Sequence, residues 1–224
     1  MGFILGKKLK MSQIFKEDKG IPVTIIQAGP VVVTQVRTKE KDGYEAVQVG
    51  FGTKKAKNIR KPQLGQFKNL GNFQYLKEYK IQDAPKDKST GQAGCRIEDF
   101  KVGDVLTVSQ LKEGEKIKIS GLSKGKGFQG VVKRYGFGGG PKTHGQKNRL
   151  RAPGSIGNTA LQRVALGRRM AGRMGQEKII VKNLEIVSVD PGKNILMVKG
   201  AVPGRKETLL KITSTKHQIT NNIK

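Results

Sequence analysis

The chain of 224 residues contains 44 Lys and Arg residues against 17 Asp and Glu residues, which gives a formal net charge of +27 at neutral pH. A fold that tolerates this self-repulsion usually binds a polyanion, and phosphate backbones gain affinity because each neutralised phosphate releases a condensed counterion. The single cysteine, Cys95, excludes an internal disulfide, and with only two histidines a metal centre is not expected. No apolar run of about 20 residues is present and the apolar run near Met1 is too short for a signal peptide, so we expect a cytoplasmic protein with neither membrane nor small-molecule partners.

Short runs rich in Val, Ile and Thr recur between turn signals, which is typical of an all-β domain. Turn residues join two pairs of these runs, at Asp42-Gly43 and at Asp190-Pro-Gly-Lys193. One helix is predicted, over residues 161–174, although its glycines weaken it. The sequence therefore predicts a mainly β fold, a barrel or a sandwich, closed so that strand edges are not exposed. The expected strands are 21–27, 31–38, 44–51, 104–110, 115–120, 178–189, 194–199 and 208–214.

One glycine-rich segment differs from this strand pattern because it contains no carboxylate. From Lys116 through Gln176 there is no Asp or Glu, and residues 121–176 contain 14 glycines and 12 Lys or Arg residues. A solvated surface interleaves both signs of charge, whereas a carboxylate buried among phosphates would be costly. We therefore expect a segment that is threaded through RNA and ordered on binding. Apolar residues such as Phe128 and Tyr135 favour this defined path over the alternative, a flexible linker.

Two shorter basic patches lie elsewhere in the chain. Residues 54–61 follow an expected strand, and Lys7-Lys8 with Lys10 form a weaker patch near the N-terminus. Either patch alone could be a solvated surface, but in a protein this basic we expect contacts with RNA phosphates. Aromatic residues are few, with eight Phe, four Tyr and no Trp. We therefore expect recognition through phosphates and RNA shape rather than through stacked bases.

Two features of the acid-free segment resemble parts of a nucleotide-binding site or an active site, but the residues around them argue against both functions. Gly125-Lys-Gly-Phe-Gln-Gly130 matches the G-x-G-x-x-G pattern of nucleotide-binding loops, yet the next acid is Glu177. A dinucleotide site needs an acid about 20 positions later and a kinase needs catalytic aspartates, so we interpret these amides as facing RNA phosphates. His144 has no nearby carboxylate in the sequence to orient it, which favours an RNA hydrogen bond over general-base catalysis.

Several blocks of the sequence carry a family resemblance. They include residues 6–15, Ser123-Lys-Gly-Lys-Gly-Phe128, Thr143-His-Gly145, Arg151-Ala-Pro-Gly-Ser-Ile-Gly157 and Met170-Ala-Gly-Arg-Met-Gly175. In type and order these blocks resemble the universal large-subunit ribosomal protein L-three family, in its bacterial or organellar form. The chain departs from that family at Lys10-Met11-Ser12, where Gly-Met-Thr is usual. It also has Asn158 where some members carry a methylated Gln, so that modification is not expected here.

The resemblance implies a closed β-barrel of the translation-protein type and a long Gly/Lys/Arg-rich extension that reaches toward the peptidyl transferase centre. It implies a structural, non-enzymatic protein of the large ribosomal subunit that binds 23S-type rRNA near its 3′ end, assists early assembly and contacts neighbouring large-subunit proteins. No cofactor is expected beyond Mg²⁺ held by the RNA.

Residues 1–115 with 177–224 should form the barrel and residues 116–176 the extension. The expected rRNA contacts are Lys7, Lys8, Lys54, Lys55, Lys57, Arg60, Lys61, Lys124, Lys126, Lys133, Arg134, Lys142, His144, Lys147, Arg149, Arg151, Arg163, Arg168, Arg169 and Arg173.

Two other functions remain open at this point. A nucleic-acid chaperone or an architectural DNA-binding protein would be equally basic but would bind arbitrary duplex DNA as tightly as rRNA. An RNA-modifying enzyme on a β-barrel scaffold would need an active-site acid or a cofactor loop, and the missing carboxylates oppose it.

Overall fold

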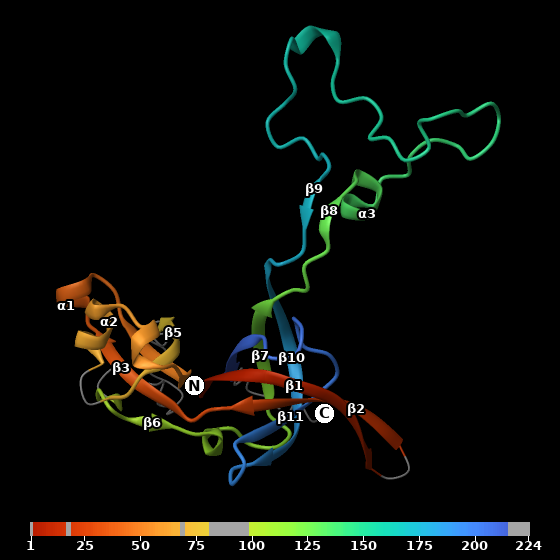
Figure 1. The fold of residues 1–224 in the computed structure, drawn as a ribbon. Coiled ribbons are helices and arrows are strands. Elements are labelled where there is room, and N and C mark those ends of the chain that lie inside the picture. The colour runs from red at the N-terminus through yellow and green to blue at the C-terminus, as the bar shows by residue number, and fades with distance from the viewer. Residues whose placement is uncertain (1, 17–18, 68–69, 81–98, 215–224) are drawn as a thin grey trace, which may run out of the picture. The chain divides into compact units, whose positions relative to one another are not determined.

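The fold is that of a computed structural model, which describes residues 2–16, 19–67, 70–80 and 99–214. Cys95 and His217 lie outside these ranges. The protein is mainly β, with short helices between the strands (Figure 1). In chain order the elements are β1 (Phe3–Lys16), β2 (Lys19–Ala28), β3 (Val31–Arg37), α1 (Lys39–Asp42), β4 (Ala46–Thr53), η1 (Ala56–Asn58), α2 (Lys61–Gln66), β5 (Phe73–Lys80), β6 (Val105–Leu106), η3 (Val108–Gln110), β7 (Lys116–Leu122), β8 (Gly127–Gln129), α3 (Val131–Tyr135), η4 (Thr159–Leu161), β9 (Gly172–Met174), β10 (Lys178–Asp190), β11 (Ile195–Lys199) and β12 (Leu209–Ser214).

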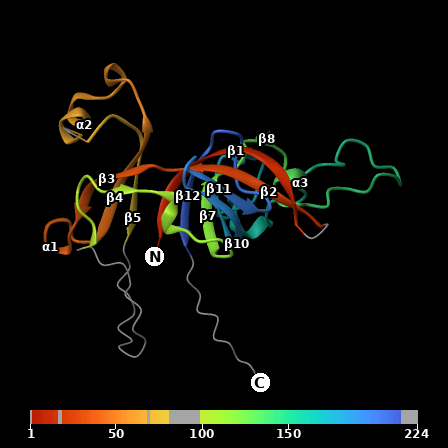
Figure 2. The same ribbon diagram turned by 90° about the horizontal axis from the view of Figure 1, so that it is seen from below.

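Six strands pair in the order β1-β12-β7-β10-β11-β2, and β2 pairs again with β1, so that the barrel closes (Figure 2). Closure pairs the backbone groups that an open sheet would leave at its edges. The β1–β2 hairpin continues past the barrel. β12 pairs with β1 only from Phe3 to Lys7, whereas β2 pairs with β1 as far as Lys16.

A second sheet of four strands, in the order β5-β4-β3-β6, follows the barrel's first hairpin in the chain. It shares one apolar core with the barrel, in which Phe3 and Ile212 belong to barrel strands and Val47 and Tyr79 belong to the second sheet. The ring of Tyr79 stacks on that of Phe3 with centroids 4.1 Å apart. Its hydroxyl donates to the carbonyl of Ile4 at 2.8 Å, and burial raises the pKa of Tyr79 well above its ordinary value.

The predicted strands are found with one partial exception, and the predicted helix is wrong. Residues 161–174 contain the end of η4, turns and β9 instead, because Gln162 and Gly167 adopt positive φ angles and Gly172 pairs with β8. The strand expected over 104–110 is limited to β6, after which the chain forms η3. β1 and β5 are not predicted as strands, since Lys residues recur in both and Val, Ile and Thr, by which the other strands are found, are scarce.

The chain divides into two compact units, and we call the second one, Leu122–Lys178, the insert. It begins later than residue 116, the expected start of the extension, because β7 pairs with β12 from Ile117 to Gly121. In the part of the chain that the structure describes, no helix is long and apolar enough to cross a membrane.

Candidate nucleic-acid interface

A short two-stranded ribbon brings the two ends of the insert together. β8 pairs with β9 in an antiparallel register that sets Phe128 opposite Arg173. The N–H of Lys126 extends this pairing by donating to the carbonyl of Met174 at 2.9 Å. Side chains on opposed residues of an antiparallel pair point to the same face. The ribbon therefore presents an aromatic ring and a guanidinium group side by side.

Glycine makes the close approach at the base of this ribbon possible. Gly175 has a φ of +76°, and a Cβ at this position would lie 2.2 Å from the carbonyl oxygen of Lys124. A residue with a side chain would suffer both from the left-handed backbone angle and from a clash with this oxygen. Directly after β8, α3 forms a short helix that ends at Gly136, whose φ is 75°.

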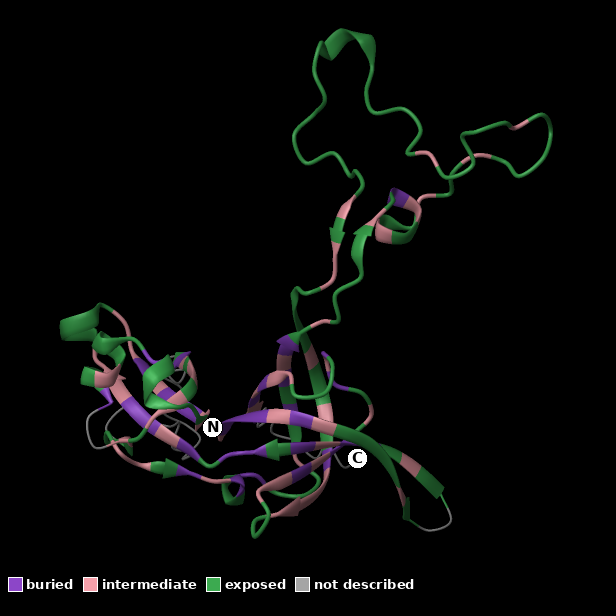
Figure 3. Ribbon diagram, viewed as in Figure 1, coloured by how far each residue is buried: buried purple, intermediate pink, exposed green. Residues whose placement is uncertain are grey.

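Almost none of the insert is buried. Among its residues only Val131 is buried, and Figure 3 shows exposed residues along most of its length. Large apolar side chains are exposed instead, with Phe128 at 77% and Leu166 at 97%. Burial of apolar surface is the main favourable term in folding, at roughly 25 cal/mol per Å². A segment that buries so little must gain its order from a partner surface.

The charges of the insert point to the chemistry of that partner. The insert contains 13 Lys and Arg residues and one acid, Glu177. Among the described residues, the ion pairs join Arg37 to Asp42 and Glu78, and Lys199 to Glu185, and all of them lie in the other unit. The cations of the insert therefore remain available for an external anion.

Two arginines of the insert are arranged around Tyr135. The guanidinium carbon of Arg134 lies 4.9 Å from the ring centroid, and that of Arg169 lies 5.6 Å from it. Arg134 also donates to the carbonyl of Met170 at 2.8 Å. Cation–π contacts of this kind hold a guanidinium in place while leaving most of its N–H groups free to donate. The cluster thus positions two arginines that the sequence predicted as RNA contacts.

A closed loop displays five of the other predicted contacts. The N–H of Gly140 donates to the carbonyl of Leu150 at 2.9 Å, and a Cβ at Gly139 would lie 2.2 Å from the same oxygen. With its amide oxygen turned inward, Gln146 accepts from the N–H groups of Arg149 and Leu150, both at 3.0 Å. His144 takes a left-handed backbone with φ 60°. The exposed side chains of this loop are Lys142, His144, Lys147, Arg149 and Arg151.

The remaining predicted contacts of the insert are also exposed. Arg168 donates to the carbonyl of Ser155, and Arg173 donates to the side-chain oxygen of Gln176. Because each guanidinium carries five N–H donors, these bonds leave capacity for an RNA oxygen. The exposed members are Lys124, Lys126, Lys133, Arg163, Arg168 and Arg173.

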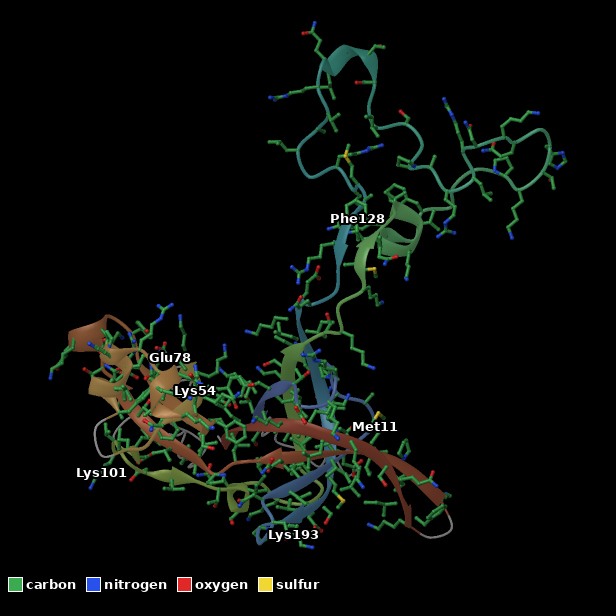
Figure 4. The ribbon with its side chains drawn as sticks, in the orientation of Figure 1. Met11, Lys54, Glu78, Lys101, Phe128 and Lys193 are labelled. Atoms are coloured by element: carbon green, nitrogen blue, oxygen red, sulfur yellow. The ribbon has the colours of Figure 1, made fainter. Side chains whose placement is uncertain are left out.

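The second basic patch is anchored to the four-stranded sheet. Ile59 and Phe67 are buried on either side of α2, and Phe67 packs edge-on against Phe73 with ring centroids 5.5 Å apart. Lys54, which is labelled in Figure 4, directly follows β4 in the chain. The patch is therefore a fixed surface in which the cations face solvent. These cations are Lys54, Lys55, Lys57, Arg60 and Lys61.

The N-terminal pair does not behave as one patch. Lys8 is buried, and its ammonium donates to the carbonyls of Val202 at 2.9 Å and Gly204 at 3.1 Å. Lys7 is half-buried and donates to Gln74 at 3.0 Å. We therefore remove Lys8 from the proposed contacts, because its ammonium is turned into the protein.

Comparison with known proteins identifies the family to which the chain belongs. A family model described as Ribosomal protein L3 matches residues 94–194, which include the whole insert. A protein of Dehalococcoides mccartyi named Large ribosomal subunit protein uL3 is 50% identical over 214 residues, covering 95% of this chain and 97% of that protein. The chain belongs to the ribosomal protein L3 family. Proteins with the same name from Chlorobium phaeobacteroides and Herpetosiphon aurantiacus are also 50% identical, over 96% and 94% of this chain and 100% and 94% of their own lengths.

In this member of the L3 family, the structure adds residues that sequence reasoning did not assign to the site. Tyr135 orients two arginines, Gln146 closes the loop that carries Arg149, and Phe128 exposes its ring beside Arg173. The available signal was the presence of aromatic residues inside a segment without acids. In the sequence, these aromatic residues indicate a defined path for the segment but do not identify site residues.

The described residues offer no obvious metal centre. No group of three or more His, Cys, Asp or Glu side chains gathers among them. Between residues 116 and 176 there is no carboxylate at all, so any divalent cation beside that segment would have to be held by the oxygens of a bound partner.

Proposed function

We propose that the protein is a structural constituent of the large ribosomal subunit that binds 23S-type rRNA near its 3′ end. The insert corresponds to the family's extension and orders rRNA helices by neutralising their phosphates. In this role it assists early assembly and supports the peptidyl transferase centre. The barrel, of the translation-protein type, contacts neighbouring large-subunit proteins in the bacterial cytoplasm.

The observation that carries this proposal is the combination of charge and burial in the insert. It presents 13 cations and one acid, and it buries the side chain of Val131 alone among its residues. A protein partner would cover apolar surface and would bring charges of both signs, whereas an RNA supplies phosphates at regular spacing. Family membership supports the same partner, since the relatives are named as large ribosomal subunit proteins.

The protein's own contribution is positional. Peptide-bond formation would be carried out by the RNA, and the protein would hold that RNA in place without a cofactor of its own. His144 is exposed on its loop and makes no hydrogen bond to the described residues, so we assign it an RNA contact rather than proton transfer.

Sedimentation tests the proposal directly. A cell lysate is fractionated on a sucrose gradient before and after a high-salt wash, and the protein is detected in each fraction. We expect it to co-migrate with the large subunit through the wash, because an insert surrounded by RNA cannot exchange without disrupting the particle. Release into the top fractions at moderate salt would contradict the proposal and favour a nucleic-acid chaperone.

A further inference from the structure

The β8–β9 ribbon carries a feature that phosphate binding does not explain. Phe128 is 77% exposed at the middle of β8, and Figure 4 shows it on that strand. Its cross-strand neighbour is Arg173, on the same face of the ribbon. An exposed phenyl ring has no attraction for phosphate, and leaving it in water forgoes the favourable burial of its apolar surface.

The surroundings of Arg173 favour a base over a phosphate. Its side chain lines an open hollow of about 460 Å³ together with Leu122, Gly175, Gln176 and Glu177. Glu177 is the one acid of the insert, and its carboxylate would repel a phosphate placed in this hollow. A guanidinium, an amide and a carboxylate together offer both donors and acceptors, which is the set that matches the edge of a nucleobase.

We propose that Phe128 and Arg173 form a stacking platform for one unpaired nucleobase of the bound RNA. The base lies against the phenyl ring, and its edge faces the polar side chains of the hollow. The cations of the insert bring the RNA to this ribbon, and Gly175 fixes the approach of the two strands. This inference rests on the proposed function, because it takes the partner to be large-subunit rRNA.

Affinity measurements on the full chain test the platform. Large-subunit rRNA is the probe, and Phe128→Leu is the main variant because leucine keeps the apolar contact but has no π-face. Base–aromatic stacking predicts that Phe128→Leu raises the Kd about five- to a hundred-fold and leaves the slope of log Kd against log salt unchanged, since no phosphate contact is lost. Phe128→Tyr should bind like the unmodified protein. A Phe128→Leu Kd equal to that of the unmodified protein would overturn the platform.

The matched control is another exposed phenylalanine on a two-stranded segment. Phe15 is 71% exposed on the β1–β2 hairpin, and its cross-strand neighbour is Gly20 rather than an arginine. Phe15→Leu should leave the Kd for rRNA unchanged. An equal loss in both variants would indicate a general apolar effect and would contradict the platform.

A spectroscopic readout separates stacking from other contacts. The chain has no tryptophan, so Phe128→Trp and Phe15→Trp each introduce a single indole. We expect rRNA binding to quench the fluorescence of Phe128→Trp and not that of Phe15→Trp. Absence of quenching in a variant that still binds rRNA would overturn the platform alone. Failure of the unmodified protein to prefer large-subunit over small-subunit rRNA would instead overturn the proposed function.

Discussion

At the scale of single residues, the same side chain type has opposite roles in neighbouring positions. Lys8 directs its ammonium inward onto two carbonyls of the β11–β12 connection, while Lys10, two residues later in β1, is exposed. The backbone of Lys8 adds to this connection, since its carbonyl accepts from the N–H of Glu207 at 2.7 Å. Lys8 therefore stabilises the fold, whereas Lys10 belongs to the surface.

Replacing Lys8 by methionine should lower the free energy of unfolding by about 1.5–3 kcal/mol, because the aliphatic stem is kept while charged hydrogen bonds to two carbonyls are lost. Urea denaturation at neutral pH measures this change. Lys10→Met is the matched control and should change the stability by less than about 0.5 kcal/mol. A Lys8→Met protein as stable as the unmodified one, with a shallower salt dependence of rRNA binding, would return Lys8 to the contact set.

Tyr79 should make stability depend on pH in the alkaline range. Burial disfavours the phenolate, so the pKa of Tyr79 is raised in the folded protein. Above about pH 10 the unfolded chain releases this proton while the folded chain retains it, and the free energy of unfolding falls as pH rises. Tyr79→Phe should lower stability by about 0.5–1.5 kcal/mol at neutral pH, through the lost bond to Ile4, and should weaken the alkaline decline. Urea denaturation across this range would contradict the argument if both proteins lost stability in parallel.

The sequence indicated which residues could contact phosphates, but not whether each side chain points to solvent or into the protein. Cations such as Lys54 and Arg149 are exposed, as a phosphate contact requires. The inward turn of Lys8 depends on carbonyls at Val202 and Gly204, about 200 positions away in the chain, and no local pattern records such a partner. Phe128 was visible in the sequence, but its pairing with Arg173 depends on a strand register formed across the insert.

At the scale of elements, the strands were predictable because their apolar residues alternate and turn residues separate them. The hairpin turn between β10 and β11 is an example, where the N–H of Lys193 donates to the side chain of Asp190 at 3.3 Å. The helix over 161–174 was wrongly predicted because apolar spacing suggested it, while the glycines of this stretch serve turns and a close strand approach. β8 and β9 are three residues each and too short to give a periodic signal.

The base of the β8–β9 ribbon offers a test at this scale. Gly175→Ala forces a non-glycine residue to a positive φ and sets its Cβ against the carbonyl of Lys124, so the ribbon should distort. We expect the Kd for large-subunit rRNA to rise about five- to thirty-fold. Gly138→Ala is the matched control, because Gly138 has no positive φ and a Cβ there would meet no atom within 4 Å. Similar affinities for the two variants would show that the ribbon geometry does not matter for binding.

At the scale of the whole molecule, the distribution of charge along the sequence indicates where the chain divides into two compact units. The acid-free segment coincides closely with the insert, and the boundary differs because β7 completes its pairing with β12 before the insert begins. The closed order of the barrel strands was expected as a class but could not be derived in detail. It joins β1 to β12, strands from opposite ends of the chain.

The salt dependence of rRNA binding should measure the phosphate contacts of two basic surfaces separately. One surface is on the insert and the other is the patch on the four-stranded sheet. Each phosphate contact contributes about 0.7–0.9 to the slope of log K against log salt, so Arg149→Gln with Arg151→Gln should reduce the slope by about 1.4–1.8. Lys54→Gln with Lys55→Gln should give a similar reduction if the patch on the four-stranded sheet binds the same RNA. Lys112→Gln with Lys193→Gln is the control, since both are exposed but lie outside the predicted contacts. An unchanged slope in the first variant would remove Arg149 and Arg151 from the interface.

The order of the barrel strands also determines when the barrel can close during synthesis. β1 is made before the insert and pairs with β12, the last described strand, which follows the insert as β10 and β11 do. A nascent chain emerges from its N-terminus, so the barrel cannot close until the insert has left the exit tunnel. For that interval the most cationic part of the chain is exposed beside unfinished strands. Nascent copies are therefore most vulnerable to misdirected binding of nucleic acid in this interval, and a chaperone that shields them would have to recognise the insert before the barrel exists.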